Sequence, residues 1–239
     1  MGSRKLRPLK AGCLRDQVKD AVRDAIFQGR FQPGDPLREL GLARDLRVSQ
    51  PTVREALLQL EQTGLVVRVP NKQTIVTQLS QQDLKERIII RILLEEAAAV
   101  EAARRIGPKE LEELERRLEA IDRAVSKNAY FELSQADLEF HRYIWWQAGN
   151  ATLARMLDNL TAPLFTFTSI LRSKSKEDLR SVVGSHGPIV AALRQGHAAT
   201  TKRTIREHIE GSYEQFLTSD WEDFQSLVRS RKLAAFVRR

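Results

Sequence analysis

The sequence predicts a mainly α-helical protein, with a winged helix-turn-helix domain at residues 1–79 and an all-α helical bundle at residues 80–239. In the N-terminal domain, apolar residues recur at helical spacing in three short runs. Two β-prone runs follow, on either side of residues 70–73, as in a hairpin. From residue 84 onward the apolar pattern is helical and contains no strand-like alternation.

The composition is that of a globular protein, because 42% of the 239 residues are hydrophobic and 29% are charged. The most apolar stretch, 88–100, contains Arg91, Glu95 and Glu96, so no segment approaches the roughly 18 apolar residues of a membrane span. The first ten residues carry charge but no apolar signal region, and we therefore expect a cytoplasmic protein without a membrane partner. Cys13 is the single cysteine, which excludes a disulfide framework and a cysteine-rich zinc site.

Positive charge is concentrated at the two ends of the chain. Residues 1–80 hold 14 Lys and Arg against 8 Asp and Glu, a net charge of +6. Residues 81–223 hold 20 against 23, a net charge of −3, and residues 224–239 add +5. A basic N-terminal segment on a mildly acidic body is typical of a nucleic-acid-binding head attached to a domain with another task.

Three helices are predicted in the N-terminal domain. The first runs from Leu14 to Ile26, and the second is a short run from Leu40 to Leu46. Ser49 is a favoured N-cap for the third helix and Pro51 suits its first turn. The buried stripe of the third helix consists of Val53, Leu57 and Leu60.

The other face of the third helix carries side chains suited to DNA. Ser49, Gln50, Thr52 and Arg54 lie near its N-terminal end, where a recognition helix contacts base edges and phosphates. Lys72 lies at the tip of the predicted wing and is a further candidate for DNA contact. Taken singly, Arg54 could form an ordinary ion pair on the helix surface and Lys72 could be an ordinary loop charge.

The run PGDPLRELGLARDLRVSQPTVREALLQLEQTGLV, followed by a short wing, resembles the DNA-binding head of the GntR family of bacterial transcription regulators. The resemblance implies that Arg54 touches the operator, with Thr52 and the wing nearby. Two positions depart from the family pattern: Gln50 stands where the family often has arginine, and the wing tip 71–73 lacks the usual glycine. Since glutamine favours adenine and arginine favours guanine, we expect an operator half-site that differs from the common one.

The C-terminal domain reads as a succession of helices. Ser80 and Asp83 form a capping pattern at its start. The predicted helices span residues 84–106, 108–126, 130–148, 151–172, 178–195 and 198–218. The tail 221–237 could add a last amphipathic helix. An all-α bundle follows from this pattern.

The domain contains a candidate metal-binding pair. Asp137 and His141 are four residues apart, so that a carboxylate and an imidazole share one helix face and can reach the same ion. His186 and His208 lie on two later predicted helices, and either alone is more often a structural histidine than a ligand. His197 follows a glycine at a helix start and is expected to be a surface residue.

The segments DLEFHRYIWWQAGNATL, SHGPIVAALRQGH and REHI resemble the helical effector-binding domain of the FadR subfamily. In its metal-binding members, an Asp-x-x-x-His helix and two later helices supply the ligands, which implies Asp137, His141, His186 and His208 here. His197 stands where the family often has aspartate. The resemblance argues against a fatty-acyl effector, because acyl-CoA-binding relatives lack the four ligands. Three imidazoles and a carboxylate suit a divalent ion such as Zn or Ni.

Three functions compete at this point. The first is a ligand-responsive transcription regulator, expected to be a repressor, that binds double-stranded operator DNA as a homodimer. The second is a metal-dependent hydrolase, which would need a general base; Glu139 lies nearly opposite Asp137 on the helix and is poorly placed for that role. The third is a DNA-binding protein whose metal is purely structural. We favour the regulator.

The effector is expected to be a small carboxylate metabolite. A divalent ion bound by Asp137 and three neutral histidines leaves a site of net charge +1, which favours an anion. Arg91 lies among apolar residues of the first helix of this domain and could bind a second carboxylate of the effector. The alternative is that Arg91 pairs with Glu95 one turn later.

Overall fold

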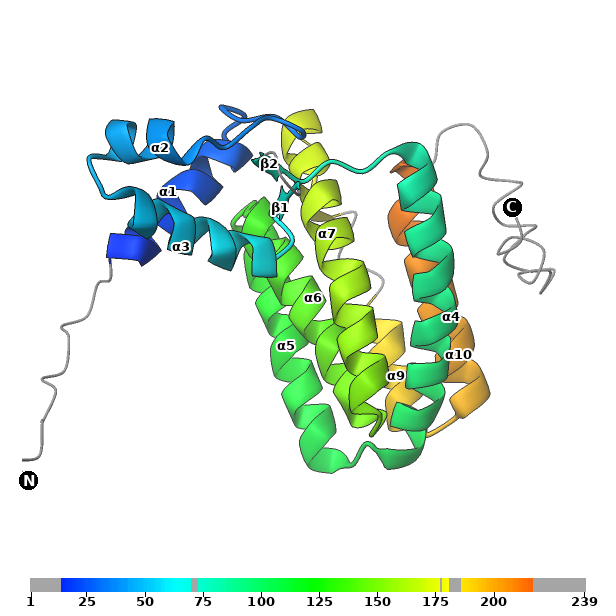
Figure 1. The fold of residues 1–239 in the computed structure, drawn as a ribbon. Coiled ribbons are helices and arrows are strands. Elements are labelled where there is room, and N and C mark those ends of the chain that lie inside the picture. Colours follow the sequence, from blue (N-terminus) through cyan, green and yellow to red (C-terminus); the bar gives the residue numbers. More distant parts are fainter. Residues whose placement is uncertain (1–13, 70–72, 177, 181–185, 217–239) are drawn as a thin grey trace, which may run out of the picture. The chain divides into compact units, whose positions relative to one another are not determined.

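The computed structural model describes residues 14–69, 73–176, 178–180 and 186–216 (Figure 1). The sequence-based expectations for Lys72, for Cys13 and for a helix in 221–237 lie outside the described residues. The chain divides into two compact units between Thr77 and Gln78. Among the described residues, no helix is both long and apolar enough to cross a membrane.

The N-terminal unit consists of three helices and a two-stranded sheet. The elements are α1 (Leu14–Phe27), α2 (Glu39–Leu46), α3 (Gln50–Gln62), β1 (Val66–Arg68) and β2 (Thr74–Val76). Both α1 and α2 pack against α3, whose apolar stripe is completely buried. The strands pair antiparallel, with Val67 opposite Ile75. This is the expected winged helix-turn-helix.

The turn between α2 and α3 sets the start of the recognition helix. Arg47 closes α2 in the left-handed conformation, with φ at 54°. The Ser49 side chain then accepts a hydrogen bond from the Thr52 backbone N–H at 3.3 Å, and Pro51 lies in the first turn. The predicted cap is therefore present, and it places the first turn of α3 at the surface of the unit.

The described part of the C-terminal unit is all-helical. Its elements are α4 (Gln81–Arg105), α5 (Pro108–Ser126), α6 (Tyr130–Gln147), α7 (Ala151–Ser175), α9 (Gly187–Arg194), α10 (Ala198–Tyr213) and the short 3-10 helix η1 (Glu214–Phe216). Helix α4 packs against α6, α7 and α10, and α6 packs against α5 and α7. The predicted capping box of Ser80 and Asp83 begins α4.

Two helix ends differ from the sequence-based expectation. Of the helix expected at 178–195, the structure describes α9 at Gly187–Arg194, with His186 as its N-cap residue rather than an internal one, and residues 181–185 lie outside the described residues. Pro188 suits this position, because proline is tolerated in the first turn of a helix, where its missing N–H would have no intrahelical partner. The last helix ends at Tyr213 and tightens into η1.

Candidate nucleic-acid interface and metal centre

Gln50, Thr52 and Arg54 lie on the side of α3 that is not buried in the core. Arg54 keeps 53% of its side chain exposed, and its Nη2 donates to the Glu39 carboxylate on α2 at 2.8 Å, with Nε at 3.1 Å. The Gln50 amide donates to the same carboxylate at 2.9 Å. Glu39 thus connects two of the candidate DNA-contacting residues.

Arg54 on α3 pairs with Glu39 on α2 rather than with a residue of its own helix. The hydrogen bond from Arg54 holds the pKa of Glu39 below its ordinary value, so the carboxylate stays ionised at neutral pH. It occupies the Nε side of the guanidinium and leaves Nη1 without a contact to it. The sequence did not identify Glu39 as a partner of Arg54, although its position as an acidic residue in the first turn of α2 could have suggested it.

Three further arginines gather beside this face. Arg38 and Arg44 come from α2 and its start, and Arg68 from β1; together with Gln50 they line a groove between α2 and the hairpin. All three arginines are exposed. Guanidinium groups in such a groove are suited to phosphate contacts. They extend the candidate DNA-binding surface beyond the residues that the sequence indicated.

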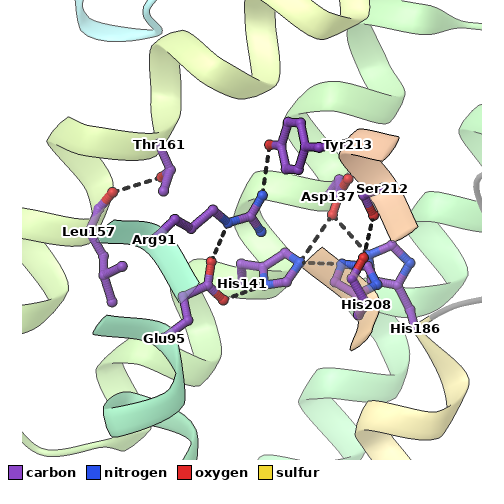
Figure 2. Close-up of polar contacts among 10 residues, drawn as sticks. All are labelled: Arg91, Glu95, Asp137, His141, Leu157, Thr161, His186, His208, Ser212 and Tyr213. Atoms are coloured by element: carbon purple, nitrogen blue, oxygen red, sulfur yellow. Dashed lines mark hydrogen bonds and ion pairs between the residues drawn. The ribbon is translucent and has the colours of Figure 1, made fainter. Parts of the chain in front are cut away.

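The four candidate metal ligands come together in the C-terminal unit (Figure 2). Asp137 and His141 lie on α6, His186 precedes α9, and His208 lies on α10. One possible ligand atom from each lies within 4.8 Å of the others, and all four residues are buried. The His186 Nε2 lies 2.9 Å from Asp137 Oδ1, and the His141 Nε2 lies 3.0 Å from His208 Nε2.

Aromatic rings fix the imidazoles in place. Phe140 meets the His186 ring edge-on at 5.0 Å between centroids, and Phe165 lies 5.7 Å from the His141 ring. These contacts restrict ring rotation in a site from which water is largely excluded. The histidines are therefore oriented by packing before any ligand enters.

A chain of charged groups continues from His141. The Glu95 carboxylate on α4 lies 2.9 Å from His141 Nδ1 and accepts a hydrogen bond from Arg91 Nε at 2.5 Å. Arg91 Nη1 donates to the Tyr213 hydroxyl at 2.7 Å (Figure 2). The pairing of Arg91 with Glu95 that the sequence left open is thus present. Sequence reasoning did not assign Glu95 to the metal centre.

Arg91 also faces a small cavity next to the four ligands. Its lining is polar and includes Arg91, Ser134, Asp137, Arg172, His208 and Tyr213. A volume of about 20 Å³ is open to the centres of water-sized molecules, which is room for about one water. The Nη2 of Arg91 and the Oγ of Ser134 are buried without a hydrogen-bond partner among the described residues. These two groups are available to a small polar ligand.

The electrostatics of the cluster favour an ionised carboxylate and neutral imidazole. Burial by itself would raise the pKa of Asp137, but the hydrogen bond and attraction from His186, together with the attraction of His141 and Arg91, lower that pKa to about 2. Burial also holds the pKa of His208 well below its usual value. At neutral pH the carboxylate is therefore charged and His208 is neutral, as metal ligation requires.

The residues present fit a divalent metal ion. Three imidazoles and one carboxylate form a donor set suited to Zn or Ni. The Nε2 of His186 lies 2.9 Å from Asp137 Oδ1 and is therefore the nitrogen that faces another candidate ligand, whereas its Nδ1 is buried without a hydrogen-bond partner among the described residues. By contrast, His197 is exposed at the N-cap of α10, outside the cluster. Glu139 is exposed and paired with Arg142, so it does not supply the general base that a hydrolase would need.

Two family models match the chain. The bacterial regulatory protein model of the gntR family matches residues 14–76, and the FCD domain model matches residues 86–211, more than half of the chain. The chain belongs to the GntR family of bacterial regulatory proteins. It combines the GntR DNA-binding head with an FCD domain, which confirms the family that the sequence motifs indicated.

Named relatives of this GntR-family chain are transcription regulators. It is 33% identical over 193 residues to the "Probable D-xylose utilization operon transcriptional repressor" of Paenarthrobacter nicotinovorans, covering 81% of this chain and 84% of the relative. It is 26% identical to the HTH-type transcriptional repressor NanR of Cronobacter sakazakii, over 95% and 92% of the two chains. The chain is thus a DNA-binding transcription regulator rather than an enzyme.

Solved structures share the fold of the GntR-family chain. McbR/YncC of E. coli superposes with a TM-score of 0.65 at 23% identity, over 86% of this chain and 99% of that one. A GntR regulator from Rhodococcus sp. RHA1 superposes with a TM-score of 0.62 at 23% identity, over 86% and 98%. These likenesses confirm the mainly α-helical fold class.

Proposed function

We propose that this GntR-family regulator is a repressor whose FCD domain binds a divalent metal ion and a small carboxylate effector. The observation that carries the proposal is the buried cluster of Asp137, His141, His186 and His208 beside a polar cavity. Zn or Ni is the metal that best suits the donor set. The relatives named as repressors support the direction of regulation.

The effector is an anion by charge balance. A divalent ion and one ligand carboxylate leave a net charge of +1, the charge of Arg91 is balanced by Glu95, and Arg172 adds positive charge to the cavity lining. The Nη2 of Arg91, which has no partner among the described residues, offers hydrogen bonds to a carboxylate, and the Ser134 hydroxyl offers one more. When bound, the metal would polarise and hold the effector oxygen closest to it. A small organic acid matches this chemistry.

Entry of the effector requires the protein to move. The cavity has room for about one water molecule, so a carboxylate and its carbon chain must displace side chains from α4, α6 and α10. Since interfaces between packed helices shift in discrete steps, this displacement starts the regulatory signal. An effector that binds one arrangement better than the other changes operator affinity by about 1 to 3 kcal/mol.

The DNA-binding part of the proposal rests on α3. Ser49, Gln50, Thr52 and Arg54 contact the operator, and Lys72, which lies between β1 and β2 in the sequence, is a further contact. One recognition helix reads only a few base pairs, so specific binding calls for a homodimer on two half-sites about one or two helical turns apart. Because operator DNA lies in the cytoplasm of a bacterium, a protein that binds it is cytoplasmic as well.

The test compares one histidine substitution with a matched control. His208→Ala removes a proposed ligand, and His197→Ala removes an exposed histidine outside the cluster. Binding of Zn²⁺ or Ni²⁺ is measured by calorimetry, and affinity for an operator selected from random DNA is measured with and without acetate, lactate or succinate. We expect metal binding and the acid response in wild type and His197→Ala, and neither in folded His208→Ala.

Two results would count against the proposal. Metal binding without any acid response would support the alternative of a DNA-binding protein with a purely structural metal. An unchanged acid response in His208→Ala would exclude the metal from the mechanism.

A further inference from the structure

We propose that Glu95 is the positioning residue of the metal centre: it holds His141 in the tautomer that can bind a metal and connects this ligand to Arg91 at the cavity. The inference rests on the proposed function for what the metal and the cavity bind. Glu95 touches neither the proposed metal nor the proposed effector, and it acts through the two residues that do.

Each oxygen of the Glu95 carboxylate has its own partner. Oε1 accepts from Arg91 Nε at 2.5 Å, and Oε2 lies 2.9 Å from His141 Nδ1. The side chain is only 1% exposed, and packing of α4 against α6 holds it between the two partners. The carboxylate is therefore a bridge of defined geometry (Figure 2).

This bridge decides which nitrogen of His141 carries the proton. Arg91 Nε donates to Oε1 at 2.5 Å, and because a guanidinium is always protonated, the buried Arg91–Glu95 contact is an ion pair with an ionised carboxylate. An ionised carboxylate only accepts hydrogen bonds, so Nδ1 of neutral His141 must be the donor. The Nε2 lone pair then points toward Asp137 Oδ1, 3.5 Å away, where the other ligands meet. His186 lacks such help, because its Nδ1 has no hydrogen-bond partner among the described residues.

The same bridge reaches the cavity. Arg91 donates from Nε to Glu95 and from Nη1 to the Tyr213 hydroxyl, and its Nη2 has no hydrogen-bond partner in the part of the chain that the structure describes; Arg91 also lines the cavity. A carboxylate bound to Nη2 would compete with Glu95 for the same guanidinium. Because Glu95 also orients His141, metal and acid then change each other's affinity, by the same factor in both directions.

The experiment compares Glu95→Gln with Glu96→Gln. Glu96 is the next residue on α4, is also buried, and pairs with Arg206 and Lys202 on α10 rather than with the cluster. The two variants thus remove the same charge from the same helix. With Zn²⁺ alone as the probe, competition against a chelator should show a 10- to 100-fold weaker affinity in Glu95→Gln, and wild-type affinity in Glu96→Gln.

A second readout needs no metal. Nitrogen-15 NMR of the histidine side chains reports the tautomer of each ring, and His141→Gln assigns the signals of His141. We expect the Nδ1–H tautomer of His141 in wild type and Glu96→Gln, and a shift toward Nε2–H in Glu95→Gln, since an amide can donate to Nδ1. If Glu95→Gln fails to fold, the double variant Arg91→Met/Glu95→Gln, which removes both buried charges, takes the place of the single variant in the Zn²⁺ and NMR measurements.

Unchanged Zn²⁺ affinity and an unchanged tautomer in Glu95→Gln would overturn the inference, as would Nε2–H His141 in the wild-type protein. Failure of the wild-type protein to bind Zn²⁺ or Ni²⁺ would overturn the proposed function instead. The tautomer comparison would still decide the role of Glu95 in that case.

Discussion

The Glu39 carboxylate on α2 accepts hydrogen bonds from both Nε and Nη2 of Arg54 on α3, at 3.1 and 2.8 Å. Gln50 donates to the same carboxylate. An arginine held on its Nε side presents a fixed edge to a base, and an orientation fixed in advance reduces the entropy lost on binding. Glu39 also places a negative charge next to a surface that must approach phosphates, which opposes nonspecific binding.

The first prediction concerns Glu39. Glu39→Gln keeps the size of the side chain but removes its charge, so Arg54 is held less firmly and repulsion of phosphates is lost. We expect affinity for random DNA to rise and the ratio of specific to nonspecific affinity to fall about tenfold, or about 1.4 kcal/mol. Fluorescence anisotropy at one fixed salt concentration measures both affinities. An unchanged ratio would show that Glu39 has no part in specificity.

The second prediction concerns Arg54 itself. Arg54→Ala should weaken specific operator binding by about 1 to 3 kcal/mol if Arg54 contacts a base. Arg44→Ala, in the neighbouring basic groove, should weaken binding to all sequences alike and flatten the salt dependence. Titrations of operator and random DNA at several salt concentrations distinguish the two. Equal losses on both DNAs in Arg54→Ala would assign that residue to a phosphate.

The third prediction concerns the metal. A chelator should lower the melting temperature of wild-type protein and of His197→Ala, but not of His208→Ala, which lacks a proposed ligand. Metal at about 100 times its dissociation constant adds about 2.7 kcal/mol of stability, because it binds only the folded state. Differential scanning calorimetry with and without chelator measures the shift. Equal shifts in all three proteins would place the metal elsewhere.

The fourth prediction concerns the start of α4. Ser80 Oγ accepts from the Asp83 N–H at 3.1 Å, and Asp83 accepts from Ser80 Oγ and N–H. Ser80→Ala should therefore cost about 1 kcal/mol in the free energy of unfolding at pH 7. Hydrogen bonds from Ser80 lower the pKa of Asp83 below its ordinary 3.8. The Asp83 carboxylate therefore contributes fully to the free energy of unfolding above pH 3.8, and this contribution is lost as the pH falls through the lowered pKa.

Urea unfolding at pH 7 and in acid measures the difference in free energy of unfolding between wild type and Ser80→Ala. This difference should become smaller in acid, where Asp83 is protonated in both proteins. A difference that stays constant with pH would assign the effect to the Ser80 hydroxyl alone.

The sequence by itself determined the elements of both units, because helical periodicity, N-caps and turn residues act within a few positions of each other. It also determined the family, through the ordered motif around Arg54. The spacing of Asp137 and His141 put both on one face of a helix whatever surrounds it.

Only the tertiary structure decided which side chains support these residues. Glu39 lies 15 positions before Arg54, and Glu95 lies 46 positions before His141, so each pair meets through helix packing that no local pattern encodes. The same holds for Arg91, whose Nη1 donates to Tyr213, 122 positions later in the chain. Its Nη2 has no hydrogen-bond partner among the described residues. Burial makes such partners necessary, since a charge removed from water must be paired. Which group forms the pair is determined by how the helices pack.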